Sequence, residues 1–571
     1  MRLSKLTIDN FRGIEHVEIE FDRDVTVLVG ENNTGKTSVL DALRLCMDIV
    51  KSDKTCNFSE FDFYRNETRS DLTSCESISI TLSFLESEDH LWPQHITQGL
   101  NDVIVGSDYS AIKFRVTASY NTDAGELVQS WSFLDDADNE MFGKAGMIKE
   151  LRRLRPFFFQ TALRAAKDQF HGQSTYWASF LRNKDIDDAI RRTLEEELDE
   201  VNKKIVDAHG SFRDVIEEVK RISDLVAVGQ ADPVTVDPAP ADVYKTLRYT
   251  DVNLLTTSNV KIPVRSHGEG TQSLSVLLLF SAYLKTRLQT EVDRHAEPIV
   301  AVEEPEAHLH PNAVRAVWDL LRDLPGQKIV ATHSGDILSE VPVPKLRRMN
   351  RNGSTTECRA IPDGLLTDDE LRMFNHHVRR NRGELLFARC WLLVEGETDV
   401  SVFAECASLL GVDLHGKGVR IVECSQAGGP GIFIKVADAL GIHWHLVADS
   451  DPGGQKYIGD AKSLLDGRSE ADHISALTHP NIDILLCCCG YGQPYLDGVG
   501  PQKEADLAGL TTDSPEYWEK VYRIVNKARR FSKPEAALKS IFKMKAAGVD
   551  GVPDELKRII DRTTAVEYTS S

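Results

Sequence analysis

Residues 25–38 read VTVLVGENNTGKTS, and this stretch decides how the first part of the chain folds. The run VTVLV predicts a buried strand, and a helix is expected to begin near Lys36. Between them, residues 30–37 match the pattern GxxxxGK[ST]. Small residues in such a loop let backbone N–H groups surround a phosphate, and the helix N-terminus adds positive potential. The sequence therefore predicts a phosphate-binding loop for a nucleotide.

Individual residues of this loop have separate tasks under that interpretation. Lys36 is expected to reach the β- and γ-phosphates of ATP, and the Thr37 hydroxyl is expected to bind Mg²⁺. The other residues expected to contact the nucleotide are Gly30, Asn33, Gly35 and Ser38. A chance match in a surface loop is the alternative, but a strand before the loop and a helix after it argue against that alternative.

Two apolar runs far downstream end in residues suited to ATP hydrolysis. The run IVAV leads into Glu303 and Glu304. A buried strand that ends in two acids would let Glu303 hold Mg²⁺ through water and Glu304 polarise the attacking water. The run IVAT directly precedes His333, and a resemblance to ABC-type ATPases, in which such a histidine contacts the γ-phosphate, implies that role here. A histidine at a strand end is more often structural when it occurs alone, so this assignment depends on the other motifs.

A glycine-rich turn and one glutamine are further candidates for the same site. Residues 266–272 read SHGEGTQ and precede an expected apolar helix. This turn resembles the signature of ABC-type ATPases, and the resemblance implies that Ser266, Gly268 and Gly270 offer N–H groups to the γ-phosphate of a nucleotide held by a second subunit. Gln160 follows three phenylalanines and is a candidate nucleotide contact. A glutamine after an aromatic strand also has many structural explanations.

Composition places the chain among ordinary globular proteins. It has 571 residues, of which 41% are hydrophobic and 27% charged, enough to bury several cores. The net charge of −21 excludes a uniformly basic nucleic-acid binder but permits a local basic groove. No apolar run has the length of a membrane helix, and the first residues lack a signal-peptide core, so we expect a cytoplasmic protein without a membrane partner. The ten cysteines lack zinc-site spacing, and the three at 487–489 are expected to be buried thiols.

The pattern of elements divides the chain into four parts. Residues 1–164 and 243–384 hold the strands and helices of the nucleotide site, and residues 385–571 begin a new α/β pattern. Between the first two parts, residues 165–242 carry apolar residues at alternating steps of four and three, which predicts paired helices in a protruding arm. An amphipathic helix on a core is the alternative. The apolar positions are Leu194, Leu198, Val201, Ile205, Ala208, Phe212, Val215, Val219, Ile222 and Val226.

Acidic side chains follow two apolar runs in the last part. The run CWLLV directly precedes Glu395, and Asp399 lies one helical turn later. The run HWHLVA directly precedes Asp449 and Asp451. Carboxylates at the strand ends of an α/β sheet can share one cation, and Mg²⁺ prefers such oxygen ligands. A lone D-x-D is usually a solvated turn, but the joint pattern predicts a metal site.

Several of these segments carry a family resemblance. Residues 6–14, LTIDNFRGI, resemble the opening of RecF-, SMC- and Rad50-type ATPases. Residues 303–311, EEPEAHLHP, resemble the acid-bearing segment of the RecF and OLD branches. The acids of the last part resemble the Toprim pattern of topoisomerases, primases and OLD nucleases. The whole chain resembles the OLD family of ATP-dependent nucleases, to which the nuclease subunit of the Gabija defence system is related. The resemblance implies an α/β fold, with an ABC-type ATPase head, an inserted helical dimerisation arm and a Toprim domain.

The resemblance also implies cofactors, partners and residue roles. ABC-type heads of this kind trap ATP between two copies, so a homodimer or a higher homo-oligomer is expected. Asp449 and Asp451 would be metal ligands. Glu395 would be an acid/base or metal-bridging residue, and Asp399 a ligand of a second metal ion. Mg²⁺ or Mn²⁺ held there would act on a phosphodiester of DNA.

The chain departs from the family pattern after the D-x-D. OLD nucleases carry a further D-x-E on a strand, which here would be residues 482–487, IDILLC. Asp483 is present, but Leu485 stands where the glutamate would fall, so a second metal would be held weakly. The segment from residue 532 to residue 538 resembles the OLD segment whose lysine, here Lys533, lies near the scissile phosphate and stabilises transition-state charge.

Positive charge gathers near the C-terminus, against the acidic average. Residues 517–545 contain only Glu519 and Glu535 as acids. The basic residues of this island are Lys520, Arg523, Lys527, Arg529, Arg530, Lys533, Lys539, Lys543 and Lys545. Such a cluster can contact DNA phosphates, and a solvated helix face is the alternative. Lys456, after the D-x-D, is another candidate phosphate contact.

Three functional hypotheses follow. The favoured one is a metal-dependent DNA endonuclease or nickase whose ATPase head regulates access, in antiphage defence or DNA processing, with or without an operon-encoded partner. The second is a RecF-like, ATP-gated DNA-binding protein with weak or partner-dependent Toprim activity, which Leu485 favours. A topoisomerase is disfavoured because the chain has no room for a catalytic tyrosine domain with a strand gate, and a primase is disfavoured because the sequence shows no template channel for polymerisation.

Overall fold

A computed structural model of the chain forms two compact units. The first unit comprises residues 1–92, 101–144 and 329–571, and the second comprises residues 93–100 and 145–328. The structure describes residues 1–48, 56–86, 92–106, 111–141, 144–161, 186–208, 210–211, 238–240, 242–247, 252–255, 259–353, 355–381, 383–512, 514–527 and 532–565.

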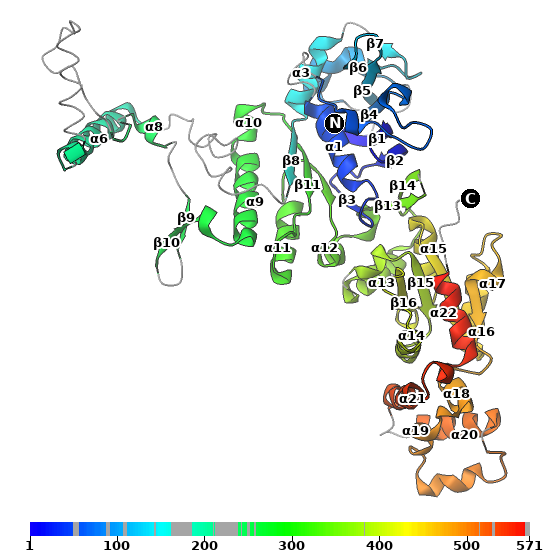
Figure 1. Cartoon of the computed structure of the whole chain (residues 1–571). Coiled ribbons are helices and arrows are strands. Elements are labelled where there is room, and N and C mark those ends of the chain that lie inside the picture. The colour runs from blue at the N-terminus through cyan, green and yellow to red at the C-terminus, as the bar shows by residue number, and fades with distance from the viewer. Residues whose placement is uncertain are drawn as a thin grey trace, which may run out of the picture. The chain divides into compact units, whose positions relative to one another are not determined.

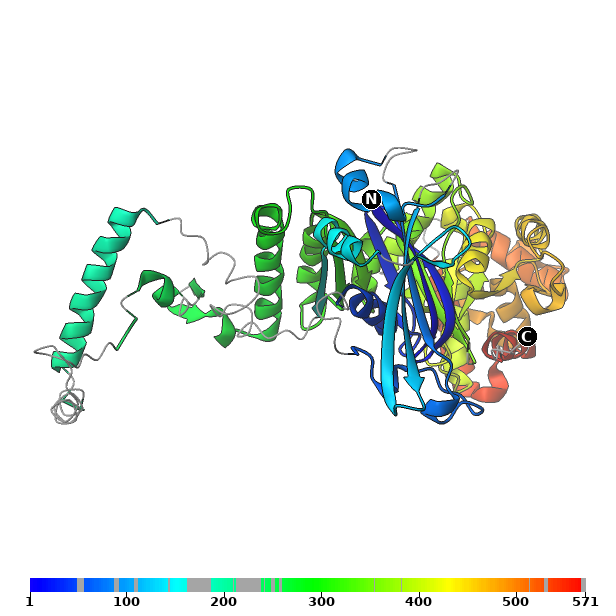
Figure 2. The ribbon, with the colours of Figure 1, turned by 90° about the horizontal axis from the view of Figure 1, so that it is seen from above.

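The first unit opens with a six-stranded sheet in the order β2-β1-β4-β5-β6-β7, in which all neighbours are antiparallel. The longer strands lie side by side in Figures 1 and 2. Alternate side chains of β4 are buried, as expected for a sheet with one face on the core. The strands are β1 (Arg2–Phe11), β2 (Ile14–Glu20), β4 (Ile78–Leu85), β5 (Ala111–Asn121), β6 (Glu126–Leu134) and β7 (Glu140–Met141).

The strand before the phosphate-binding loop is confirmed, and so is the helix after it. All five residues of β3 (Val25–Val29) are buried, and α1 (Lys36–Asp48) begins at the expected lysine. β3 pairs in parallel with β13 (Leu346–Asn352), which pairs antiparallel with β14 (Thr355–Arg359). Continuous burial of an apolar strand is typical of parallel sheets.

The second unit holds the other expected ATPase elements. β8 (Phe157–Thr161) and β11 (Ile299–Glu303) are parallel neighbours. Helix α9 (Glu269–Thr286) packs on β8, with the Phe158 ring 5.7 Å from that of Phe280. The remaining elements of at least three residues are α2 (Gln94–Leu100), α3 (Ala145–Leu154), α6 (Asp188–Ala208), α8 (Val243–Leu247), β9 (Asn253–Leu255), β10 (Lys261–Pro263), α10 (Leu288–Glu291) and α11 (Pro311–Arg322).

Half of the apolar positions of the predicted arm fall within the described residues. Helix α6 carries its first five apolar positions, and Leu194, Val201 and Ile205 are exposed there. The other five, from Phe212 to Val226, lie outside the described residues. An exposed apolar seam is what an unpaired heptad strip presents to a partner helix. Dimerisation through this arm stays a prediction.

The C-terminal part of the first unit contains a four-stranded, fully parallel sheet in the order β16-β15-β17-β18. Its strands are β15 (Cys390–Val394), β16 (Val419–Glu423), β17 (His443–Ala448) and β18 (Ile474–Ala476). The connecting helices are α14 (Glu397–Leu409), α15 (Gly431–Leu440) and α16 (Pro452–Lys462). Crossover helices on both faces explain why Trp391 and Trp444, on neighbouring strands, are wholly buried. Both predicted strands that precede acids are confirmed.

β13 is joined to this sheet by one buried arginine. Arg348, only 2% exposed, donates to the carbonyls of Ala388 at 2.7 Å and Leu440 at 3.0 Å. A buried guanidinium needs all its donors satisfied, and backbone carbonyls from two loops do this here. Between β13 and β15 lie α13 (Asp368–Arg380) and the turn Glu384–Phe387, while β12 (Gln327–Ala331) and α12 (Gly335–Glu340) precede β13 in the chain.

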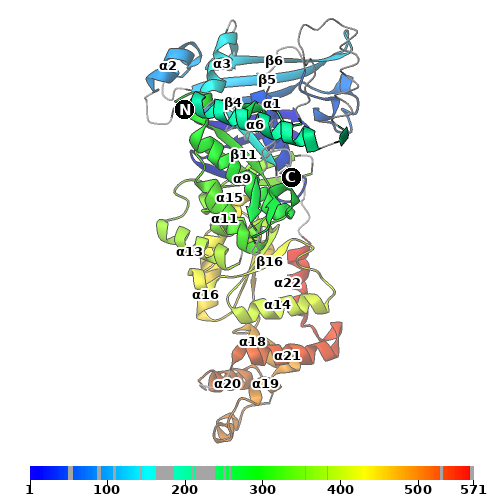
Figure 3. The same cartoon turned by 90° about the vertical axis from the view of Figure 1, so that its left-hand side faces the viewer.

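Helices follow β18 to the end of the chain. They are α18 (Ile482–Leu486), the π-turn Cys487–Tyr491, α19 (Gln493–Leu496), the turn η10 (Pro501–Leu507), α20 (Pro515–Asn526), α21 (Lys533–Ala547) and α22 (Asp554–Thr564). α14 packs against α21 and α22 (Figure 3). No helix among the described residues combines the length and apolar character needed to cross a membrane.

Two expectations for this region are wrong. Residues 482–486 form helix α18 rather than a strand, because the Asn481 side chain caps the segment by accepting from Ile484 N at 3.0 Å. A short apolar run cannot be assigned to a strand or a buried helix by periodicity alone. Leu485 is therefore a core residue, 3% exposed. The cysteine run is buried only at Cys487, since the π-turn exposes Cys489.

Candidate functional site

The phosphate-binding loop has a backbone that only its glycines permit. Gly30 has φ +152°, and a Cβ there would lie 2.4 Å from the Met349 carbonyl oxygen. Gly35 has φ +96° and packs against Ile14, and Asn33 between them also has positive φ, at 64°. Asparagine is one of the few other residues that tolerate this conformation. Such alternation of backbone conformation turns successive N–H groups toward one anion.

Backbone carbonyl groups of this loop hold its lysine in place. Lys36 is buried, and its Nζ donates to the carbonyl oxygens of Gly30 at 2.9 Å and Glu31 at 2.7 Å. Thr37 is exposed at the start of α1. The N–H of Thr332 donates to the carbonyl oxygen of Leu28, on the strand β3 that precedes the loop, at 3.2 Å. His333, the residue after Thr332, is exposed. The first unit thus brings His333 to the same sheet edge as the loop.

The paired acids and the glutamine meet in the second unit. Val302 is in register with Gln160, and Glu303 with Thr161. The Gln160 Oε1 atom is buried without a hydrogen-bond partner among the residues that the structure describes. Glu304 is exposed and has φ 46°, a conformation that a glutamate adopts only where its surroundings require it. A buried, unpartnered amide beside two acids is typical of a site that completes its bonds with a ligand.

The glycine turn lies against the loop that follows the paired acids. Gly268 is the N-cap of α9, and a Cβ on Gly270 would lie 2.6 Å from the His308 carbonyl oxygen. Glu269 forms an exposed ion pair with His308 at 3.0 Å. Ser266 ends the preceding turn Val264–Ser266. The second unit therefore groups the turn with the segment that carries the paired acids.

The predicted metal site is built on two neighbouring parallel strands. Glu395 directly follows β15 and Asp449 directly follows β17, and the N–H of Asp449 donates to Glu395 Oε1 at 2.8 Å. Helix α16 begins close above them. A Cβ on Gly454 would lie 2.0 Å from Asp449 O and 2.7 Å from Glu395 Oε1, so only glycine permits this approach. The strand ends and the helix N-terminus thus enclose the two acids.

The carboxylates of this site oppose one another's ionisation. Burial, reinforced by Asp399, Glu395 and Asp451, raises the pKa of Asp449 to about 9. Burial, reinforced by Asp483 and Glu395, raises the pKa of Asp399 to about 7. The pKa of Glu395 is also raised by burial. Carboxylates that oppose one another's ionisation are stabilised as anions by a bound divalent cation, so this donor set fits a metal ion.

The fourth predicted ligand is turned toward its own helix. Asp451 is the N-cap of α16, where its Oδ1 accepts from Gly453 N at 2.8 Å and Gly454 N at 2.9 Å. Asp399 similarly accepts from Gly396 N at 2.7 Å. Within the described ranges, no group of three or more His, Cys, Asp or Glu side chains is arranged to hold a metal ion. Coordination by Asp451 would require its carboxylate to leave the cap.

Helix α18 carries Asp483, the acid of the D-x-E pattern that this chain retains. Asp483 is 4% exposed and accepts a hydrogen bond from the Tyr495 hydroxyl, and the nearby Tyr522 hydroxyl also favours its ionised form. Lys533 Nζ donates to the Tyr522 hydroxyl at 2.6 Å and lies 4.7 Å from its ring centroid. Burial raises the pKa of Asp483, and its charge in turn raises that of Asp449. The structure thus links Lys533 to the acids through a tyrosine that no motif indicates.

The basic island separates into groups with different surroundings. Lys539 pairs with Glu535 at 2.8 Å and Lys545 with Glu405 at 2.6 Å. Lys533 belongs to the acidic site, and Arg529 and Arg530 lie outside the described residues. The remaining members with a described location are Lys520, Arg523 and Lys527, which line one cavity, and Lys543, which is exposed on α21 as Lys456 is on α16.

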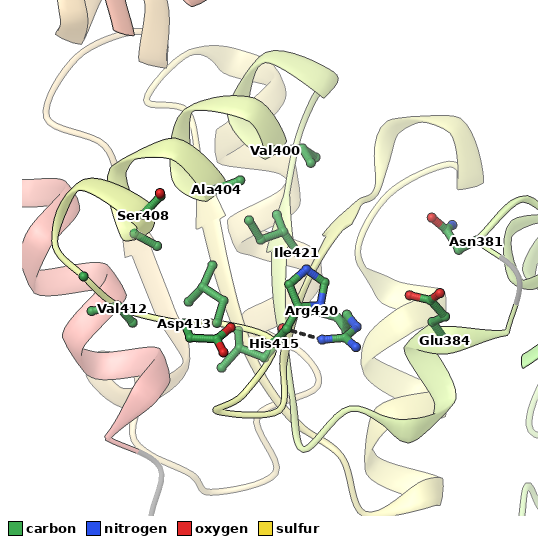
Figure 4. A pocket seen from close by; sticks show the side chains of 14 residues that line it. Asn381, Glu384, Val400, Ala404, Ser408, Val412, Asp413, His415, Arg420 and Ile421 are labelled. Atoms are coloured by element: carbon green, nitrogen blue, oxygen red, sulfur yellow. Dashed lines mark hydrogen bonds between the residues drawn. The ribbon is translucent and has the colours of Figure 1, made fainter. Parts of the chain in front are cut away.

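Another cavity is lined by none of the predicted site residues. It has a volume of about 630 Å³ and lies between α14 and β16 (Figure 4). Val400 and Ala404 line it from α14, and Arg420 and Ile421 from β16. None of the carboxylates discussed above lines this cavity. We therefore assign the candidate chemistry to the strand-end acids.

Comparison with known proteins agrees with this architecture. Residues 1–384 match the family described as "Protein of unknown function (DUF2813)", and residues 386–451 match the "Overcoming lysogenization defect protein-like, TOPRIM domain". The chain is 28% identical to the uncharacterized protein YbjD of Escherichia coli, over 98% of both chains. It is 25% identical to the OLD nuclease of Thermus scotoductus, over 79% of this chain and 82% of that protein. It is 22% identical to the endonuclease GajA of Bacillus cereus, over 80% and 76%. The chain therefore belongs to the DUF2813 family and carries an OLD-like Toprim domain.

Proposed function

We propose that this chain is an ATP-binding and ATP-hydrolysing, divalent-metal-dependent DNA endonuclease or nickase of the OLD type. The observation that carries the proposal is the contact between Glu395 and Asp449 at neighbouring strand ends, within an enclosed and mutually repelling group of acids. Relatives named nucleases over most of the chain support the same activity. We also propose that it acts in the cytoplasm as a homodimer, with antiphage defence as its setting.

The chemistry divides among a few side chains. Glu395 and Asp449 would hold the metal, with Asp399 and Asp451 as further ligands; a bound divalent ion supplies an activated water and neutralises charge on the phosphate. Lys533 would place its ammonium against the developing charge of the phosphodiester. Its contact with Tyr522 restricts where that ammonium points.

ATP would bind at the other phosphate site of the chain. Lys36 would exchange its loop carbonyls for the phosphates, and Thr37 and Glu303 would hold Mg²⁺. Glu304 would orient the attacking water. Ser266, Gly268 and Gly270 would face a nucleotide held by the second copy, which makes hydrolysis depend on the dimer.

The proposal is tested with supercoiled plasmid. The purified chain is incubated with Mg²⁺ or Mn²⁺, with and without ATP, beside Glu395→Gln and Asp449→Asn. We expect nicking or linearisation that both variants reduce by at least about 10³-fold, because each removes a metal-binding charge. Glu470→Gln, which alters only an exposed ion pair with Lys462, is the matched control and should cut normally.

A second function is favoured by one observation. Asp451 serves as a helix cap, and no three-residue metal cage is formed within the described part of the chain. An ATP-gated DNA-binding protein with a weak or partner-dependent Toprim domain would have this geometry. Absence of cutting under every metal condition, together with retained DNA binding, would favour this function over the nuclease.

A further inference from the structure

A cationic cavity lies among the C-terminal helices, apart from the carboxylates. It has a volume of about 670 Å³ and lies between α20 and the turn η10. Lys520, Arg523 and Lys527 line it from α20 and its C-cap, and Lys503 with Asp506 from η10. We call it the cationic cleft. Its one acid is already paired with Lys503 at 3.3 Å, so the cleft carries a surplus of positive charge.

The three cations of α20 share one helix face by their spacing. Positions 520, 523 and 527 differ by three and four residues, which brings them onto the same side of the helix. The opposite side carries Trp518 and Val521, which are buried in the core. Among the residues that the structure describes, Lys520, Arg523 and Lys527 have no ion-pair partner. In a chain of net charge −21, three such cations on one face favour a polyanionic ligand.

Another side of helix α20 contacts residues of the candidate catalytic site. Tyr522 precedes Arg523, and successive helical residues point about 100° apart. Tyr522 contacts Asp483 and Lys533, so α20 stands between those residues and the cleft. Its thickness of roughly 10 Å sets the scale of that separation. An anion in the cleft would thus lie near the candidate catalytic site without contacting the acids.

We propose that the cationic cleft binds the phosphate backbone of DNA beside the position where the strand is cut. This inference rests on the proposed nuclease function and names how its substrate is held. The cations from Lys520 to Lys527 extend over about 10 Å of helix, which is the length that roughly three base pairs occupy along the axis of a DNA duplex. A row of that length fits successive phosphates better than a single small anion. The cleft holds the flanking strand while Lys533 and the carboxylates act on the scissile phosphate.

The test measures DNA affinity of the full chain in EDTA, so its outcome does not depend on cutting. Fluorescent duplex DNA is titrated between about 50 and about 200 mM salt. We expect the triple variant Lys520→Gln, Arg523→Gln, Lys527→Gln to bind at least about tenfold more weakly at the lowest salt. The slope of log K against log salt should fall in magnitude by roughly 2 to 3, because each lost phosphate contact removes about one unit.

The matched control removes three positive charges elsewhere in the C-terminal part. Lys417→Gln, Lys462→Gln, Arg558→Gln changes net charge equally at exposed positions outside the cleft and should leave the slope unchanged. Glutamine retains helix propensity, so the cleft variant should unfold at the same temperature. If it does not, the single variants of the exposed Arg523 and Lys527 replace it, each with a slope change of about 1.

Three outcomes would overturn the inference. One is a slope of log K against log salt that is the same for the cleft variant and the unsubstituted chain. Another is a loss of DNA affinity in the control variant that equals the loss in the cleft variant. The third is binding of inorganic phosphate or ATP that the cleft variant loses while its DNA affinity stays normal, which would assign the cleft to a small phosphate ligand. If the unsubstituted chain never cuts plasmid yet its DNA binding depends on the cleft, the nuclease proposal fails and the cleft assignment stands.

Discussion

The phosphate-binding loop and the strand-end carboxylates follow parallel strands in the same compact unit, yet they are organised in different ways. In the loop, the Lys36 ammonium donates to backbone carbonyls of the loop itself at 2.7–2.9 Å. At the strand ends, Asp449 and Asp399 have raised pKa values because of burial and mutual repulsion. Backbone conformation therefore organises the loop, whereas the carboxylates form a donor set that fits a cation.

This contrast predicts where each site is sensitive to substitution. The conformation of the loop requires positive φ at Gly30 and Gly35. We therefore expect the loop to lose its function when either glycine or its one cation, Lys36, is replaced. A carboxylate site should lose activity when one of its charged side chains is replaced. The hydroxyls that contact its charged groups determine how well those groups are oriented. The predictions below test this difference, from the largest expected effect to the smallest.

Lys36→Ala should have the largest effect. It removes the loop's only ammonium, so ATP hydrolysis should fall at least about 100-fold. Plasmid cleavage measured without ATP should stay within about twofold, because the carboxylates do not involve this lysine. Phosphate release and plasmid nicking, measured on one preparation, check both statements. Undiminished ATP turnover in the variant would contradict the assignment of the loop.

Tyr522→Phe should have an intermediate effect, confined to the carboxylate site. The variant keeps the ring that Lys533 approaches but removes the hydroxyl that accepts from Lys533 and favours the ionised form of Asp483. We expect the cleavage rate to fall about tenfold, since a misaimed charge weakens transition-state stabilisation. DNA affinity, ATP turnover and thermal unfolding should not change.

A second tyrosine supplies the control for that variant. The Tyr491 hydroxyl donates to Gly551 O at 2.7 Å, in the same group of helices but away from Asp483. Tyr491→Phe should cleave at the normal rate. Equal losses in the two variants would mean that Tyr522 is a structural residue rather than one that positions Lys533.

The same contrast explains how far sequence reasoning could reach. The loop and both acid-bearing strands were predictable, because strand burial and glycine spacing are local properties of residues 25–38, 390–394 and 443–448. Asp483 was judged by a D-x-E spacing that assumes a strand, but Asn481 starts a helix there. Tyr522 lies 39 residues after Asp483 and meets it only through packing of α20. Long-range contacts of this kind leave no periodic signal.

The smallest expected effect concerns an ion pair between the two sites. Arg389 directly precedes β15, and its Nε and Nη2 donate to the two carboxylate oxygens of Glu31 in the phosphate-binding loop, both at 2.6 Å. This contact lowers the pKa of Glu31, so the pair persists at neutral pH and is lost as pH falls through that lowered pKa. It ties the loop to the start of the strand that ends at Glu395.

Arg389→Gln and Glu31→Gln should each weaken the influence of ATP on cleavage. Both side chains are more than a third exposed, so the pair is worth no more than about 1 kcal/mol, or a change of roughly two- to fivefold in the ratio of cleavage rates with and without ATP. The double variant should lose no more than either single variant, because both remove one interaction. Lys462→Gln and Glu470→Gln break an equally exposed ion pair of 2.8 Å and should leave the ratio unchanged. Additive losses in the double variant would mean that the ion pair does not transmit nucleotide binding to the carboxylates. The same conclusion would follow if the unsubstituted chain cleaved at the same rate with and without ATP.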